Sequence, residues 1–341
     1  MKMQKSQTRW IPLLVGFAVI SGLIYRFGER WLRALLLYLS TAVWARQLVT
    51  QLPFAWRVAS RFVAGENIEA ALATAKALND KGMLATMDFL GESVTSTQDA
   101  FAARDEILRL LDRIHESGVK ANVSVKLSQL GLKMDEALAL DNVRQLLIRA
   151  QQYQNKIRID MEESDVTEAT LHVYRTLRDE YGFGRDVGIV IQSYLYRSEE
   201  DVQQLVKEGA WVRLCKGAYM EPPEVAYPEK GKTDASYVRL MQMMLGADAR
   251  ENGVYLGVAS HDEKMIDAAK HFAADQGVSR SAFEFQMLYG IRRELQQGLV
   301  NDGYQVRIYV PYGTAWYPYF VRRLAERPAN LWFFISNFLR N

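Results

Sequence analysis

Hydrophobic and polar positions follow two alternating patterns from Gly82 to Pro328. Short apolar runs, typical of buried strands, alternate with longer segments whose apolar residues recur every three to four positions, as in amphipathic helices. The predicted strands are residues 84–90, 122–130, 156–162, 187–195, 211–219, 255–261, 283–288 and 305–311. The predicted helices are residues 97–116, 135–152, 165–181, 199–208, 234–252, 262–276, 290–301 and 314–326.

This strict alternation of strand and helix indicates parallel strands with helices outside them. Eight strand–helix pairs are the number that closes a barrel. No glycine-rich fingerprint follows the first predicted strand, which argues against a doubly wound dinucleotide-binding fold. The sequence therefore predicts an α/β protein, a (β/α)8 TIM-type barrel with additional N-terminal helices.

The chain before the barrel divides into two regions. Residues 1–9 are polar and basic, whereas residues 10–25 are almost free of polar groups. This run is slightly shorter than the roughly 20 residues that span a bilayer, and no clear cleavage site follows it. We expect residues 1–30 to be an apolar anchor at the cytoplasmic face of a membrane, or else a helix packed on the protein. Residues 31–81 are expected to be helical, and residues 82–341 to form the catalytic barrel with a C-terminal helix at 331–339.

Composition and short motifs argue against several classes of protein and of binding site. The chain has 341 residues and a formal net charge of +2, so nothing indicates a nucleic-acid surface. The single cysteine, Cys215, excludes an intrachain disulfide and fits a reducing compartment. The four histidines lack the spacing of a metal site, so no metal is expected. The Gly-Lys-Thr at 231–233 is no phosphate loop, because Ala226 stands where the motif requires glycine.

Polar residues alternate with apolar residues along several predicted strands. The apolar faces must meet the helices, so the polar faces line the barrel interior. Lys126 and Asp160 lie near the C-terminal ends of their strands, where barrel enzymes carry their working residues, and we expect them to be functional. Arg213 and Lys216 add positive charge close to another strand end.

Other inward charges lie lower in the predicted barrel and suit a structural role. Arg158 and Glu162 share one face of their strand, and Glu284 and Arg307 occupy inward positions of the last two strands. Buried charges persist only when they are paired or bound to a ligand. We expect two ion pairs, Arg158–Glu162 and Glu284–Arg307, although a functional role for the four residues stays open.

The predicted helix after the last strand carries Tyr319, Arg322 and Arg323 on one face. Two adjacent guanidinium groups suit a carboxylate, although a solvated basic face is the alternative. With Lys126 and Arg213 they give the predicted site a surplus of positive charge. A phosphate-bearing cofactor and a carboxylate substrate would satisfy that charge.

Eight motifs, in order, resemble those of flavin-dependent proline dehydrogenases, and the likeness covers roughly residues 36–341. Seven lie in or after the first seven predicted strands: MDFLGE at 87–92, VSVKLSQLG at 123–131, RIDMEES at 158–164, VGIVIQSYLYR at 187–197, VRLCKGAYMEP at 212–222, VASHD at 258–262 and FEFQMLYGIR at 283–292. The eighth is the closing segment at 307–328, in which Arg-x-Tyr-x-Pro-x-Gly is followed by Tyr-x-x-Arg-Arg-x-x-Glu. We expect the single-function bacterial type, because the second domain of the bifunctional enzymes cannot fit in this length.

The resemblance implies roles for residues at the substrate site. Asp160 would order the site by pairing with basic groups, and Arg213 would lie beside flavin N5 as the second catalytic residue. The residues implied in binding proline are Lys126, Arg322 and Arg323 for the carboxylate, and Tyr309, Tyr319 and Leu288 around the ring.

The resemblance also implies FAD as cofactor, held at the C-terminal ends of the barrel strands. The residues at matching positions are Met161, Gln192, Arg213, Lys216, Gly217, Ala218, Ser260 and His261. Cys215 and Ser260 depart from the valine and threonine usual in the family, and neither change should remove a ligand. A histidine such as His261 at a strand end is, on its own, more often a structural hydrogen-bonding group than a catalyst.

The implied reaction is hydride transfer from L-proline to FAD, which gives Δ1-pyrroline-5-carboxylate. A membrane quinone would accept the electrons, and a pyrroline-5-carboxylate dehydrogenase is a possible downstream partner. Two alternatives stay open, namely another (β/α)8 enzyme that binds a phosphate or carboxylate ligand, and a non-catalytic, membrane-anchored flavin-binding protein.

Overall fold

A computed structural model describes residues 35–36, 38–40, 42–51, 53–91 and 94–326. The chain divides into two compact units, one formed by residues 60–316 and the other by residues 1–59 and 317–341. The first unit contains the barrel. The predicted apolar segment at 10–25 and the predicted helix at 331–339 lie outside the described residues.

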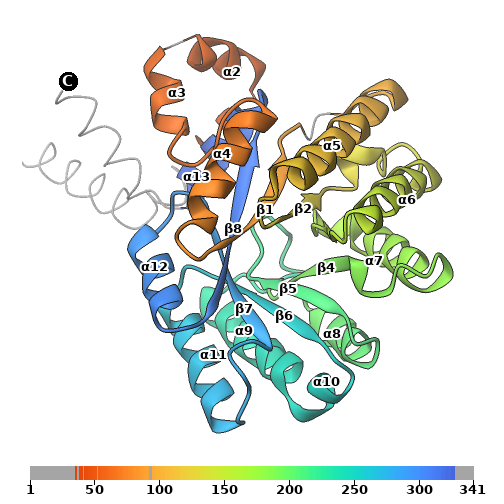
Figure 1. Cartoon of the computed structure of the whole chain (residues 1–341), viewed down its shortest axis with the longest axis vertical. Coiled ribbons are helices and arrows are strands. Elements are labelled where there is room, and N and C mark those ends of the chain that lie inside the picture. Colours follow the sequence, from red (N-terminus) through yellow and green to blue (C-terminus); the bar gives the residue numbers. More distant parts are fainter. Residues whose placement is uncertain (1–34, 37, 41, 52, 92–93, 327–341) are drawn as a thin grey trace, which may run out of the picture. The chain divides into compact units, whose positions relative to one another are not determined.

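The barrel is closed and all of its strands are parallel, in the order β1 to β8 with β8 beside β1. This confirms the predicted (β/α)8 fold. Figure 1 shows the strands at the centre of this unit and the helices around them. The strands are β1 (Leu84–Phe89), β2 (Ala121–Val125), β3 (Ile157–Ile159), β4 (Val187–Gln192), β5 (Trp211–Cys215), β6 (Tyr255–Ala259), β7 (Phe283–Leu288) and β8 (Gln305–Tyr312).

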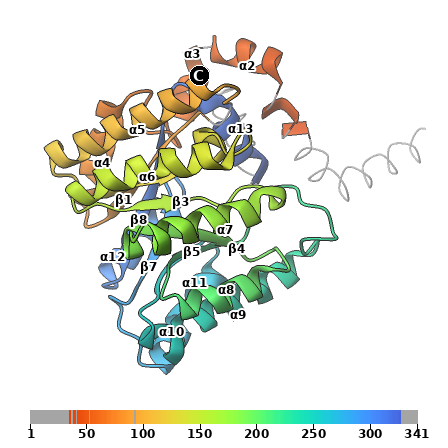
Figure 2. The same cartoon turned by 90° about the vertical axis from the view of Figure 1, so that its right-hand side faces the viewer.

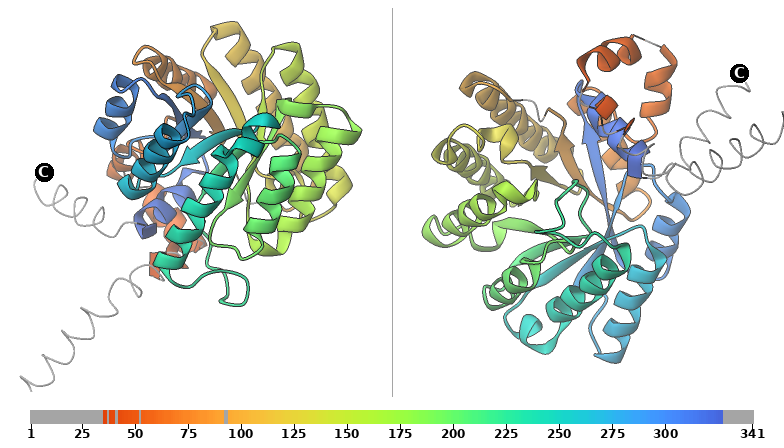
Figure 3. Two further views of the ribbon diagram at one scale, coloured as in Figure 1. Left: turned by 90° about the horizontal axis from the view of Figure 1, so that it is seen from below. Right: turned by 180° about the vertical axis from the view of Figure 1, so that it is seen from behind.

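Helices connect the successive strands, and Figures 2 and 3 show this arrangement from the side, from below and from behind. The helices of the barrel unit are α4 (Ile68–Asn79), α5 (Thr97–Ser117), α6 (Glu136–Gln152), α7 (Thr167–Arg175), α8 (Ser198–Lys207), α9 (Lys230–Leu245), α10 (Ala247–Glu251), α11 (Glu263–Asp275) and α12 (Arg293–Asn301). In the other unit the structure describes α2 (Val43–Thr50), α3 (Pro53–Ala59) and, from its second residue onward, α13 (Trp316–Glu326).

Local sequence explains where these helices begin and end. Ser96 caps α5 by accepting a hydrogen bond from the Asp99 amide, while the Asp99 carboxylate accepts from the Ser96 amide. This reciprocal cap satisfies amides that the first helical turn leaves unpaired. Gly118 ends the helix with φ of 67°, a left-handed conformation that glycine adopts without a steric penalty.

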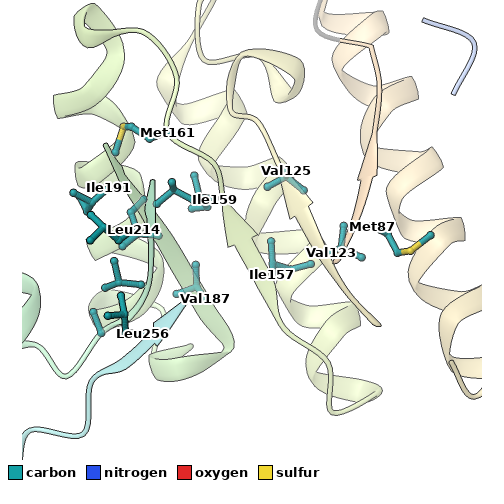
Figure 4. Close-up of a cluster of buried hydrophobic side chains, with 14 of the residues drawn as sticks. Met87, Val123, Val125, Ile157, Ile159, Met161, Val187, Ile191, Leu214 and Leu256 are labelled. Carbon is teal, nitrogen blue, oxygen red and sulfur yellow. The ribbon is translucent and has the colours of Figure 1, made fainter. Parts of the chain in front are cut away.

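The main hydrophobic core lies between the strands and the surrounding helices. Val123, Val125, Ile157 and Ile159 are completely buried there, and Figure 4 shows them with neighbours from other strands. These residues occupy the outward positions of β2 and β3, so the intervening polar residues point into the barrel. The alternation of polar and apolar residues along each strand therefore determines which side chains point into the barrel interior.

The bounds of several predicted elements differ from those in the structure. The predicted strand at 122–130 ends at Val125, and residues Ser128–Leu130 form a short 3₁₀ turn. The predicted strand at 156–162 ends at Ile159, so Asp160 is the first residue after it. The predicted helix at 234–252 begins earlier, at Lys230, and is broken into α9 and α10 at Gly246, whose extended backbone (ψ 174°) interrupts the helical hydrogen bonds.

The register of the strands brings polar side chains of different strands to one level. Asp88 lies opposite Ser124, and Ser124 lies opposite Arg158, so β1, β2 and β3 are fixed against one another. Val190 and Gly257 flank Arg213 on the two neighbouring strands. None of the helices that the structure describes is long and apolar enough to cross a membrane.

Candidate active site

Asp160 is the centre of a cluster of polar side chains at the C-terminal ends of the barrel strands. Its Oδ1 lies 2.7 Å from Arg213 Nη1 and accepts a hydrogen bond from Ser124 at 2.9 Å. Its Oδ2 accepts a hydrogen bond from the Tyr309 hydroxyl at 2.7 Å and lies 3.6 Å from Lys126 Nζ. One carboxylate therefore contacts groups from β2, β5 and β8 and the residue that follows β2.

The cations around Asp160 hold it in the charged form. Burial alone would raise the pKa of the carboxyl, but Arg213 and Lys126, together with the hydrogen bond from Tyr309, lower the pKa below its ordinary value. Burial, followed by the charge of Asp160, raises the pKa of the Tyr309 phenol, so that group remains a neutral donor. The predicted ordering role of Asp160 is consistent with this geometry.

Arg213 is held along two edges of its guanidinium group. Its Nη1 contacts Asp160 and Ser124, and its Nε donates to Gln286 Oε1 at 2.5 Å. The group lies 5.1 Å from the centre of the Tyr309 ring. The remaining nitrogen, Nη2, is buried and has no hydrogen-bond partner among the described residues. Arg213 is thus fixed in position while retaining one unused donor.

Lys126 follows β2 directly and is 9% exposed. Its ammonium group lies 3.0 Å from Asp88 Oδ1 and donates to the Tyr309 hydroxyl at 3.3 Å. The two carboxylates of Asp88 and Asp160 therefore flank this cation. The structure brings together Lys126, Asp160, Arg213 and Tyr309, four residues that the sequence assigned to one site.

Gln286, Asp88 and Ser124 belong to this cluster, but sequence reasoning gave them no role in the site. The alternation of polar and apolar residues places Gln286 and Ser124 on the inward faces of their strands, and Asp88 lies in the motif MDFLGE. The signal that could have found Asp88 is its carboxylate on a strand that is otherwise apolar apart from Thr86. All three side chains are buried, and each bonds directly to Lys126, Arg213 or Asp160.

The residues expected to hold the cofactor lie on several strand ends. Gln192, the last residue of β4, donates to the Glu162 carbonyl at 2.8 Å. Met161 is buried in the main hydrophobic core. Ser260 accepts from the Asp262 amide at 3.0 Å, and His261 Nε2 accepts from the Leu288 amide at 2.9 Å. These contacts hold the strand ends in place, and the cofactor roles of these residues remain predictions.

Lys216, Gly217 and Ala218 follow β5. Lys216 Nζ contacts the carboxylates of Asp234 at 2.5 Å and Asp262 at 2.7 Å, and Lys230 contacts the same two groups. A side chain at Gly217 is excluded, because a Cβ there would lie 2.3 Å from the Tyr194 ring and φ is 110°. The segment after β5 is therefore tied to α9 and to the cap of α11.

The expected ion pair between Arg158 and Glu162 is wrong. Arg158 donates to the Ile189 carbonyl at 3.1 Å and lies over the Trp211 ring at 3.7 Å, while Glu162 accepts hydrogen bonds from the Ser128 amide and hydroxyl. Because β3 ends at Ile159, Glu162 no longer follows the strand's alternation. The second expected pair is confirmed, since Arg307 Nε lies 2.7 Å from Glu284 Oε1.

Tyr319, Arg322 and Arg323 are carried by α13, and the Arg323 guanidinium lies 5.2 Å from the centre of the Tyr319 ring. Within the same unit, the Tyr317 hydroxyl donates to the Leu39 carbonyl at 3.0 Å. These residues belong to the unit that also contains α2 and α3. The predicted binding of a carboxylate by Arg322 and Arg323, and the predicted places of Tyr319 and Leu288 around the proline ring, therefore stay predictions.

Comparison with known proteins relates this chain to a family. The profile of the family described as "Proline dehydrogenase" matches residues 71–335. The "Proline dehydrogenase" of Deinococcus radiodurans is 44% identical over 288 residues, which cover 84% of this chain and 91% of that protein. "Proline dehydrogenase 1" of Bacillus subtilis strain 168 is 42% identical over 83% of this chain and 91% of that protein.

A solved structure agrees with the sequence comparison. Proline utilization A (PutA) from Bdellovibrio bacteriovorus matches with a TM-score of 0.74 and 29% identity, over 79% of this chain and 32% of that chain. The match to the family profile includes all eight strands of the barrel and the cluster around Asp160. The resemblance seen in the motifs is thereby confirmed, and the chain belongs to the proline dehydrogenase family.

Proposed function

We propose that this proline dehydrogenase oxidises L-proline to Δ1-pyrroline-5-carboxylate with FAD, and that a membrane quinone accepts the electrons. The observation that carries the proposal is the buried cluster in which Asp160 contacts both Arg213 and Lys126. The cluster lies at the C-terminal ends of the strands, where (β/α)8 enzymes bind their substrates. Membership of the family implies a flavin, and a pyrroline-5-carboxylate dehydrogenase is the proposed consumer of the product.

The chemistry of Arg213 fits an electron-rich flavin ring. Its Nη2 is buried without a hydrogen-bond partner in the described part of the chain, whereas its other nitrogens are bonded to side chains. A buried donor without a partner is costly, and an acceptor on a bound ligand would relieve that cost. Bound FAD would supply the hydride acceptor for proline oxidation.

The residues of the chain bind and orient the substrate. Lys126 supplies a fixed ammonium group for the proline carboxylate, because Asp88 and Asp160 hold its position. Tyr309 places a phenol ring beside Lys126 and Arg213. Proline must lose its amine proton before it can release hydride, so activity should rise with pH until the bound amine is neutral.

We further propose that Arg322 and Arg323 on α13 bind the carboxylate of proline. Arg322 and Arg323 are adjacent cations, and one of them adjoins the Tyr319 ring. We expect Arg323→Met to raise KM for proline by about tenfold or more, because a charge-assisted contact contributes ~1.5–3 kcal/mol. FAD content should stay unchanged. An unchanged KM would contradict the assignment.

The cofactor, product and acceptor can be tested on the full-length protein. The cofactor released by heat is identified by chromatography against FAD and FMN standards. The protein is then incubated with L-proline and either an artificial dye or a membrane quinone, and the product is identified by mass spectrometry. We expect FAD, Δ1-pyrroline-5-carboxylate and reduction of both acceptors. A colourless protein, or one that reduces neither acceptor, would refute the proposal.

We propose that the barrel faces the cytoplasm and that residues 1–30 attach it to the membrane. The support is the basic and apolar sequence of this segment. Deleting residues 1–30 should release the protein into the soluble fraction and preserve proline:dye activity, while activity with a membrane quinone falls. Full-length protein that is soluble at both low and high salt would contradict attachment.

A further inference from the structure

A cavity lies at the opposite end of the barrel from the cluster around Asp160. It has a volume of about 280 Å³. Trp211 and Tyr255, which line it, are the first residues of β5 and β6, and Arg185 lies in the turn before β4. These positions place the cavity at the N-terminal end of the strands. Its volume is slightly below the roughly 300–1,000 Å³ of ordinary ligand pockets, which suits a small ligand.

The charged residues that line the cavity are all cationic, namely Lys156, Arg185 and Arg307. Arg307 is bonded to Glu284, and Arg185 donates to the Gly253 carbonyl. Lys156 differs from both, because its ammonium group has no carboxylate or hydrogen-bond partner among the described residues. Its contact is with the Trp211 ring, whose centre lies 5.5 Å from Nζ.

A second buried cation reinforces this charge. Arg158 lies two residues after Lys156 and therefore shares its face of the strand. Its guanidinium is fully buried, lies 3.7 Å from the centre of the Trp211 ring, and leaves Nε and Nη2 without partners in the part of the chain that the structure describes. Lys156 and Arg158 thus lie against the same indole ring, and no carboxylate of the described residues contacts either cation.

The nearby carboxylates do not cancel this charge. Glu284 is already engaged by Arg307 and Gln286, and Asp186 accepts a hydrogen bond from Gln151 at 2.8 Å. Burial lowers the pKa of Lys156; the charge of Asp186 opposes this effect, and the neighbouring cations Arg185, Arg158 and Arg307 lower the pKa further. A half-buried ammonium beside other cations is unfavourable unless an anion offsets the charge.

From the cationic cavity and from the Lys156 ammonium, which no carboxylate of the described residues contacts, we propose that the N-terminal end of the barrel binds a small anion carrying a phosphate or carboxylate group. Lys156 and Arg307 supply charged donors to the anion, and Arg185 lies at the exposed edge of the cavity. The Trp211 ring offers an apolar surface to the rest of the ligand. This site is separate from the proline site, so its occupant does not compete with proline.

The test measures the unfolding temperature of the full-length protein in increasing inorganic phosphate, with sodium chloride at matched ionic strength as reference. A parallel series uses malonate, so the two arms separate phosphate from carboxylate recognition. We expect at least one anion to raise the unfolding temperature beyond the chloride reference, as binding to the native state requires. Saturating L-proline should leave this rise unchanged.

Lys156→Gln removes the charge and keeps most of the side-chain length. We expect it to move the midpoint of the anion effect to at least about tenfold higher concentration, the consequence of losing one charge-assisted contact. Lys207→Gln is the matched control, because Lys207 is an exposed lysine at the end of α8 and lies outside the cavity lining. This control should keep the midpoint of the wild-type protein.

The protein without added anion provides a check on folding. Lys156→Gln should unfold in chloride at the same temperature as the wild-type protein or at a higher one, because it removes an uncompensated charge. Anion effects that equal the chloride reference would overturn the proposal. So would an equal anion effect in wild-type and Lys156→Gln proteins, or an effect that proline abolishes, because the anion would then bind elsewhere.

Discussion

Two guanidinium groups inside the barrel have opposite surroundings. Arg213, at the C-terminal end of β5, is bonded to the Asp160 carboxylate and to Gln286. Arg158, on β3, donates to one backbone carbonyl and otherwise lies against the Trp211 ring. Burial, followed by the charge of Arg213, lowers the pKa of Arg158, although a guanidinium remains protonated in proteins.

The comparison distinguishes two kinds of cation. Those at the C-terminal end of the barrel are paired with carboxylates, whereas Arg158 and Lys156 are not paired with a carboxylate of the described residues. At the C-terminal end, Asp88 and Asp160 hold Lys126 and Arg213 in place. Such a fixed arrangement suits a reaction site, because the groups need no reorganisation when substrate binds. At the N-terminal end, Lys156 lines a cavity and is contacted by no carboxylate in the part of the chain that the structure describes, which suits an exchangeable anion.

Replacing Arg213 should have the largest effect on catalysis. Arg213→Met removes the charge nearest Asp160 and a donor proposed to face the flavin, so we expect kcat/KM for proline to fall at least about a hundredfold, or ~2.7 kcal/mol. Arg239→Met is the control, since Arg239 forms an exposed ion pair with Glu199. A loss within about twofold, ~0.4 kcal/mol, would show that Arg213 is structural only.

Replacing Gln286 should have a smaller effect, exerted through Arg213. Gln286 accepts from Arg213 Nε and donates to Glu284, and Gly257 provides its space, because a Cβ there would lie 2.4 Å from Gln286 Nε2. We expect Gln286→Leu to lower kcat about tenfold, ~1.4 kcal/mol, with a smaller change in KM.

The reduction potential of the bound flavin distinguishes a role of Gln286 in positioning Arg213 from a general loss of stability in the Gln286→Leu variant. The reduction potential of the bound flavin should fall if the Arg213 charge moves away from it. Gln203→Leu, at an exposed position of α8, should change neither value. A loss of activity accompanied by an unchanged potential and an equal loss of thermal stability would contradict the positioning role.

The smallest expected effect concerns stability in acid. Burial alone would raise the pKa of Asp262, but its contacts with Lys216 lower the pKa to about 2. The ordinary value is about 3.9, so the carboxylate stabilises the fold above pH ~4 and that contribution is lost as the pH falls towards 2. Asp262→Asn should therefore show a weaker loss of unfolding free energy across this range.

Urea unfolding at pH 7, 4 and 3 would measure this effect. Asp267→Asn is the control, because Asp267 is exposed on the same helix, α11. The acid sensitivity of the control should match that of the wild-type protein. If Asp262→Asn has the same acid dependence as the control, the contacts of Lys216 do not contribute to stability.

The sequence predicted the barrel because the period of the hydrophobic pattern depends on local structure alone. It also placed Lys126, Asp160 and Arg213 together, since the C-terminal ends of parallel strands meet at one end of a barrel. It wrongly predicted that Arg158 pairs with Glu162, whereas Arg158 packs against the Trp211 ring. That contact depends on the stagger between β3, β4 and β5, which alternation along one strand does not specify.

The role of Gln286 was missed for a related reason. Its inward orientation followed from the alternating pattern, but its partner Arg213 lies two strands away. The contact crosses β6 and needs the space above Gly257, where a Cβ would lie 2.4 Å from Gln286 Nε2. Asp88 was missed because an isolated acidic residue on a strand carries no local sign of the lysine that pairs with it.

The central claim is that Asp160 orders the cations of a proline-oxidising site. Rapid anaerobic mixing of the full-length flavoprotein with L-proline, followed by the visible flavin absorbance, tests it most directly. We predict rapid bleaching in the wild-type protein and bleaching at least about a hundredfold slower in Asp160→Ala, a difference of ~2.7 kcal/mol in the barrier. Asp267→Ala serves as the exposed control. A wild-type protein that does not bleach, or an Asp160→Ala variant that bleaches at the wild-type rate with equal flavin content, would contradict the account.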